Sequence, residues 1–192
     1  MAPRFGAGYG TFPTICMHAM TWDSSQTAAS MLVGYREVLG PVMRHAFSIP
    51  CCSLYLPVYC TGYLPLGAQI GGEFYDSQSL WWLFERLAMI VSADSDLFSP
   101  QVRQAAHSLE LQFDQAAAHT EALAVRSIKE GNPSHAMDLL NRLMDDCAEK
   151  AVAFAGEQFQ LIRAQLAERG GLAGPRQDFL LEYCRRVHMT LL

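Results

Sequence analysis

Cysteine, histidine and hydroxyl side chains gather in the first third of this 192-residue chain. Cys16 and His18 alternate with Ile15 and Met17, so in a β-strand both side chains point to one face. A cysteine and a histidine on one face can act as a nucleophile with its base, or as two metal ligands. Ordinary packing explains them too, because cysteine is among the most buried residues. The pair alone therefore leaves both interpretations open.

Two further groups carry the same ambiguity. Thr27 and Ser30 lie among alanines, where small side chains let a ligand or another backbone approach, and crowded sheet packing explains them equally well. Cys51 and Cys52 are adjacent, so in a strand they point to opposite faces and at most one can face a site. No Cys-x-x-Cys spacing predicts a zinc site or a disulfide framework, and no phosphate loop, His-Glu-x-x-His or Gly-x-Ser-x-Gly motif occurs. We expect no metal and no cofactor.

Charge and hydropathy exclude two classes of partner. The formal net charge is -5, and the first lysine is Lys129, so the chain lacks the clustered cations that nucleic-acid binding needs. The longest apolar runs are far below the roughly 18 residues of a membrane span, and the first residues contain no apolar signal segment. We expect reduced cysteines and a cytoplasmic location.

The pattern changes at about Gly72. Residues 1–72 predict an antiparallel β-sheet portion, and residues 73–192 predict a helical portion that packs on it. Breaks are expected at 22–25, at Gly40-Pro41 and near Pro50. The expected strands form a meander over residues 12–20, 26–36, 42–49 and 51–63.

Apolar residues at helical spacing follow. Asp76 or Ser77 is expected to cap a helix with one apolar stripe, formed by Leu80, Phe84, Leu87, Ala88 and Val91. Ser99-Pro100 predicts the start of a long helix that ends at 131–133, and Ser134 predicts the start of a second that ends at Gly170-Gly171. Two helices of roughly 30 residues make an antiparallel hairpin about 45 Å long. A last amphipathic helix is expected within 176–192.

Three stretches carry a resemblance to a known family. They are TICMHAMTWDSSQTAASM from residue 14, PCCSLYLPVYCTGYLPLG from residue 50 and FYDSQSLWWLFERL from residue 74. Their Cys-Met-His strand, Pro-Cys-x-Ser strand and Ser-x-Trp-Trp helix, in this order and spacing, resemble the C-terminal half of the dipeptidase and secernin family of cysteine peptidases (peptidase C69). The resemblance covers residues 14–165, most of the chain.

The resemblance implies an α+β fold that is half of the αββα sandwich of N-terminal nucleophile hydrolases, followed here by the helical hairpin and the C-terminal helix. In that family a cysteine at the mature N-terminus attacks an amide carbonyl, its own α-amino group is the base, and a thioester forms and hydrolyses without a metal. This chain lacks the family's Cys-Thr-Thr-like opening and the Gly-rich, Asp-containing loop after it. Cys16 lies inside an internal strand motif, and cleavage before it would remove residues 13–15 from that strand. Cys16 is therefore a weak candidate nucleophile.

The leading hypothesis is a separately encoded, non-nucleophile subunit of a split amidohydrolase or dipeptidase that acts on a small amide or peptide. A partner chain resembling the family's N-terminal half would bring the cysteine, so the complete domain is a hetero-oligomer. By resemblance, His18, Thr27, Ser30 and Cys52 are candidates for the substrate pocket. A half-sandwich also predicts an open sheet edge and an uncovered apolar face. The alternatives are a non-catalytic interaction or scaffold protein derived from that fold, and a self-sufficient hydrolase that uses Cys16.

Overall fold

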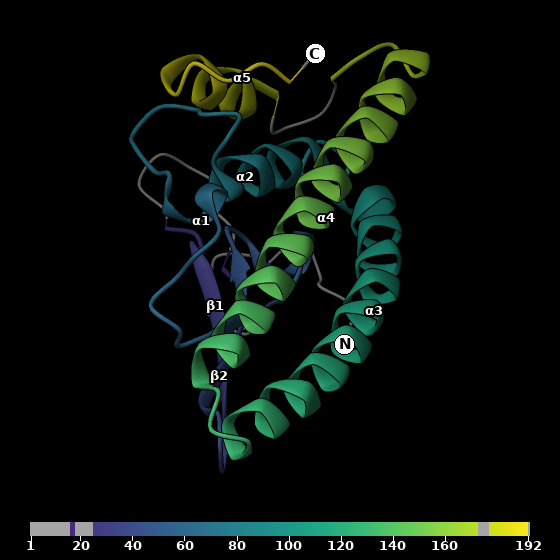
Figure 1. Cartoon of the computed structure of the whole chain (residues 1–192). Coiled ribbons are helices and arrows are strands. Elements are labelled where there is room, and N and C mark those ends of the chain that lie inside the picture. Colours follow the sequence, from purple (N-terminus) through teal and green to yellow (C-terminus); the bar gives the residue numbers. More distant parts are fainter. Residues whose placement is uncertain (1–15, 18–24, 173–176, 192) are drawn as a thin grey trace.

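The computed structural model describes residues 16–17, 25–172 and 177–191. It is an α+β fold in which a three-stranded antiparallel sheet precedes long helices, as the sequence predicts (Figure 1). One hydrophobic core runs from the sheet through all the long helices. Most of the expected strand at 12–20, His18 included, lies outside the described residues.

The sheet is a meander in the order β1-β2-β3, with β1 at Ala29–Arg36, β2 at Gly40–Phe47 and β3 at Leu56–Tyr59. The expected break at Gly40-Pro41 is wrong, because the turn precedes Gly40, which opens β2 with a positive φ of 74°. In the register, Met31 faces His45, which faces Leu56, and Val33 faces Met43, which faces Val58. These two rows lie on one face of the sheet.

The expected strand over 51–63 begins later than predicted. Pro50–Cys52 form a short 3₁₀ helix, η1, with proline at its start, so Cys51 and Cys52 do not lie in a strand and do not point to opposite faces. Proline fixes φ near -65°, which favours this turn over an extended conformation. The short helix α1, Leu66–Gln69, follows β3 and precedes the expected change at Gly72.

Helix α2, Leu80–Val91, carries the expected stripe, and all five of its predicted residues are buried. Its cap is wrong in the prediction: Ser79 accepts the Trp82 amide, whereas the Asp76 carboxylate accepts the Gln78 amide in the preceding turn. The expected caps, Asp76 and Ser77, lie two or three residues before the observed cap Ser79, because Asp76 forms an Asx turn ahead of the first helical turn.

The expected hairpin consists of α3, Ser95–Lys129, and α4, Pro133–Glu168, which run antiparallel (Figure 1). Pro100 does not start α3 but lies inside it, because Phe98 and Ser99 are buried in the core and extend the helix backwards. Asn132, not Ser134, caps α4 by accepting the His135 amide. The expected stop at Gly170-Gly171 is confirmed, since both residues have positive φ.

Helix α5, Gln177–Arg186, lies over α2, at the same end of the molecule as the C-terminal end of α4 (Figure 1). Leu180 is buried, and Phe179, Tyr183 and Val187 pack partly against the core, so the helix covers a surface as its pattern predicts. The Val187 carbonyl accepts the Tyr75 amide at 2.8 Å, which joins the C-terminal segment to the loop before α2.

One face of the sheet is fixed to α3 by carboxylates spaced four and seven residues apart. Arg44 of β2 donates to Asp114 at 2.8 Å, and the Tyr55 amide donates to Glu110 at 3.0 Å. Glu121 accepts from Arg36 at 3.1 Å and from the Tyr59 hydroxyl at 2.8 Å. The opposite face, which carries the two rows above, is called here the open face because its β1 side chains are exposed, although α4 packs against its β3 side.

Candidate functional site

Three sulfur atoms lie in a row at the start of the described chain. The Cys16 thiol donates to Cys51 at 3.7 Å, and the Cys51 and Cys52 sulfurs are 3.8 Å apart. The 3₁₀ turn of η1 creates this row, because it brings the sulfurs of consecutive residues together. Cys16, the weak candidate nucleophile, therefore has a thiol beside it, and Cys52 belongs to the same cluster.

The environment of the row disfavours a thiolate at Cys51. The hydrogen bond from Cys16 lowers the pKa of Cys51, but the contact with Cys52 and burial raise it, and the pKa lies well above its usual range. A protonated, desolvated thiol is a poor nucleophile. Within the described part of the chain, no group of three His, Cys, Asp or Glu side chains has the arrangement of a metal site.

The two hydroxyl candidates hold the chain near this row. The Thr27 hydroxyl accepts the Met17 amide at 2.9 Å, and the Thr27 amide donates to the Met17 carbonyl at 3.0 Å. The Ser30 hydroxyl accepts from the Tyr55 hydroxyl at 2.9 Å. The structure thus brings Cys16, Thr27 and Cys52 to one end of the sheet, with Ser30 at the start of β1. His18 lies outside the described residues.

A buried carboxylate stands close to this end of the sheet. Glu85 on α2 is fully buried and accepts three side-chain hydrogen bonds: from Gln26 at 2.7 Å, from Ser48 at 2.5 Å and from Tyr183 at 2.9 Å. Burial, followed by the nearby Glu85 charge, raises the pKa of Tyr183, so its hydroxyl stays a donor. Burying a carboxylate is tolerated only when donors surround it, and these three come from before β1, after β2 and α5.

Sequence reasoning missed this cluster, although a signal was present. Glu85 stands between Phe84 and Leu87 in the most apolar helix of the chain, where a charge on the buried side requires partners. Ser48, one of those partners, has a φ of 57°, which a non-glycine residue rarely adopts. The backbone there places the hydroxyl against Glu85. The cluster joins four segments and has the character of a structural clamp.

Strand β1 leaves large apolar side chains in water. On the open face, Met31, Val33 and Tyr35 are 57%, 60% and 75% exposed. On the α3 face, Leu32 is 59% exposed. No described strand pairs with the outer edge of β1. In the part of the chain that the structure describes, β1 therefore has an unpaired outer edge and exposed apolar side chains, whereas helices lie across the β3 side of the open face.

No protein-family model, curated protein or solved structure matches this chain. None of the helices in the described ranges is long and apolar enough to cross a membrane. The chemistry open to the site consequently follows from its geometry. The candidate side chains Cys16, Thr27, Ser30 and Cys52 all have partners, and β1 offers backbone groups and apolar side chains to another surface.

Proposed function

We propose that this chain is the non-nucleophile subunit of a split cysteine N-terminal nucleophile amidohydrolase or dipeptidase. A partner chain completes the αββα sandwich and supplies the N-terminal cysteine that forms the thioester. The present chain completes the fold and lines the pocket for a small amide or peptide, in a hetero-oligomer in the cytoplasm. The single observation that carries the proposal is that β1 exposes apolar side chains and that, among the described residues, no strand pairs with its outer edge.

An exposed apolar edge strand is unusual in a finished fold. Natural sheets protect their edges with charges, proline, bulges or a covering element, because an open edge pairs with other chains. β1 has eight residues, and its charged residue, Arg36, is at the very end and is engaged by Glu121. An apolar patch of this kind marks an interaction surface. A partner strand beside β1, with its sheet against the β1 side of the open face, would bury Met31, Val33 and Tyr35 together.

The chemistry at the sheet end agrees with a nucleophile on another chain. The one described sulfur row contains a thiol at Cys51 whose pKa is raised, so this cluster is a weak source of thiolate. Thr27, Ser30 and Cys52 remain pocket candidates through their place at this end of the sheet. The Thr27 hydroxyl holds the Met17 backbone and the Ser30 hydroxyl holds the Tyr55 side chain. Such ordering is what a supporting subunit contributes to a site shared between chains.

The test is co-expression with the product of the adjacent reading frame, followed by co-purification and intact-mass analysis with a cysteine-directed amide-analogue probe. Val33→Lys places a charge on the open face and is expected to abolish co-purification. Val152→Lys is the matched control, since Val152 is 42% exposed on α4 and should leave the complex intact. The probe is expected on an N-terminal cysteine of the partner.

Other outcomes assign the chain differently. A partner that binds through β1 while neither chain takes the probe or hydrolyses amides supports the alternative, a non-catalytic interaction or scaffold protein. Labelling of Cys16 in the isolated chain contradicts the proposal and supports a self-sufficient hydrolase.

A further inference from the structure

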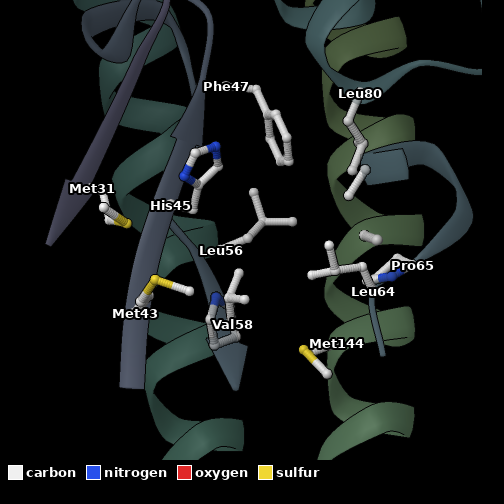
Figure 2. A pocket seen from close by; sticks show the side chains of 13 residues that line it. Met31, Met43, His45, Phe47, Leu56, Val58, Leu64, Pro65, Leu80 and Met144 are labelled. Atoms are coloured by element: carbon white, nitrogen blue, oxygen red, sulfur yellow. The ribbon is translucent and has the colours of Figure 1, made fainter. Parts of the chain in front are cut away.

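A cavity of about 310 Å³ lies between the open face of the sheet and helices α1, α2 and α4 (Figure 2). On the sheet side its wall includes Met31, Met43 and His45, and across from them lie Leu64, Leu80 and Met144. The volume falls at the lower end of the range for small-molecule sites, about 300–1,000 Å³. The wall thus comes from strands and helices that are far apart in the sequence, and the fold brings them together.

The lining is apolar apart from one imidazole. All thirteen lining residues are Met, His, Phe, Leu, Pro, Val or Ala, and none carries a full charge at neutral pH. His45 is the single strongly polar side chain among them, and burial lowers its pKa. A neutral imidazole presents one hydrogen-bond donor and one acceptor. A charged ligand would be buried here without a counter-charge, which is costly.

We propose that this cavity binds a small neutral molecule with an apolar body and one hydroxyl, carbonyl or N–H group that hydrogen-bonds to His45. A dry cavity of about 150 Å³ in another protein holds one benzene ring, so twice that volume fits a two-ring body or a chain of roughly ten carbons. Methionines on β1, β2 and α4 adapt their rotamers to different apolar shapes. The ligand class is therefore defined by size, neutrality and a single polar group.

This inference does not require the split hydrolase. The cavity is formed by one chain, and its test uses the purified chain without a partner. None of Cys16, Thr27, Ser30 or Cys52 lines it, so loss of ligand binding and loss of amide hydrolysis are separate results.

The first experiment is titration calorimetry of the 192-residue chain with straight-chain 1-alkanols of increasing length. Each added methylene is expected to raise the affinity about fourfold until the chain length fills the cavity, at roughly ten carbons, after which the gain stops. Ala148→Leu fills the cavity from α4 and is expected to reduce binding of the best alkanol at least about tenfold. Ala153→Leu, the same change at an exposed position of α4, is the matched control.

A second variant covers a failure of Ala148→Leu to fold. Ala68→Leu fills the cavity from α1, where Ala68 is half-buried, and is expected to have the same effect. The role of His45 is tested with indole and indene, which share a shape but differ in the N–H group. The wild-type chain is expected to prefer indole about fivefold, and His45→Leu to lose that preference.

Absence of a plateau in the alkanol series, or equal binding by the wild-type and Ala148→Leu chains, overturns the proposal. A purified chain that binds no alkanol also overturns it, and in that case we would ask whether Ala148→Leu loses the complex with the partner while Ala153→Leu keeps it. That last result assigns the cavity to a side chain of the partner protein.

Discussion

The two edges of the sheet differ in what covers them. At β3, four residues long and containing Pro57, the Tyr59 amide donates to the Met144 sulfur of α4 at 3.4 Å. Thr61 and Tyr63, just after the strand, also reach α4, through Asn141 at 2.6 Å and Asp145 at 2.6 Å. At β1, twice as long, no described element occupies the outer edge.

The difference shows which edge of the sheet the described residues cover. A short strand that contains proline and contacts a helix is a protected edge, whereas a long apolar strand that no described element covers is open to pairing with another strand. Burial follows the same direction across one row of the open face: Leu56 on β3 is buried, His45 on β2 is half-buried and Met31 on β1 is exposed. Burial on the open face is therefore greatest at β3 and least at β1.

The largest effect on folding is expected at the β3 edge. Truncating one methionine at each edge of the sheet tests this. Met144→Ala removes a side chain that is 1% exposed between α4 and β3, and we expect a loss of about 2–5 kcal/mol of unfolding free energy. Met31→Ala, on the exposed strand, is expected to change it by less than about 0.5 kcal/mol. Urea unfolding followed by circular dichroism measures both. Equal losses would falsify the assignment of the two edges.

A smaller loss is expected at the clamp that holds the β1 side in place. Glu85→Gln keeps the size of the side chain but turns one acceptor oxygen into a donor, which opposes the donors Gln26, Ser48 and Tyr183. We expect a loss of about 1–3 kcal/mol, because at least one buried group is left without a partner. Glu149→Gln, at an exposed position of α4, is the matched control and should stay within about 0.5 kcal/mol of wild type.

The clamp also predicts where stability is lost. Gln26 lies three residues before β1, so hydrogen exchange in Glu85→Gln is expected to rise in β1 and α5 more than in β3. A uniform rise over all three strands would contradict a local role for Glu85.

The sequence predicts these elements better than their borders. The meander and the helical hairpin follow from hydrophobic period and from Gly131 and Gly170, whose positive φ values end their helices. One error is local, because Pro50 bends Cys51 and Cys52 into η1. The other comes from tertiary packing, because burial of Phe98 carries α3 back past Pro100. A local pattern cannot report such contacts.

The sequence predicted which residues of the candidate site meet better than it predicted the contacts around them. The chemistry-bearing residues Cys16, Thr27 and Cys52 do meet at one end of the sheet, because the meander returns there. The contacts of Glu85 with Gln26 and Tyr183 span 59 and 98 residues, and no short-range pattern encodes them. The cavity depends in the same way on α4 returning past the sheet after a long hairpin.

The smallest effect is expected from pH at the middle strand, between the two edges. Burial lowers the pKa of His45 below its ordinary value of 6.5, so the unfolded chain binds a proton more readily than the folded chain. The contribution of His45 to the unfolding free energy is constant above about pH 7.5, where the imidazole is neutral in both the folded and the unfolded chain. As pH falls below the unfolded value, the unfolded state is favoured, until the folded pKa is reached.

This trend isolates how far the open face excludes water at His45. As the pH falls from about 7 to about 5, the wild-type chain is expected to lose unfolding free energy relative to His45→Leu. Urea unfolding of both chains at each pH measures this difference. His107→Leu, at an exposed imidazole on α3, controls for the loss of a histidine as such. A neutral ligand in the cavity, or a partner on the open face, should bury His45 more deeply and make this change with pH steeper. A difference that does not change with pH means that water reaches the imidazole. In that case the exposed part of the open face includes β2 as well as β1.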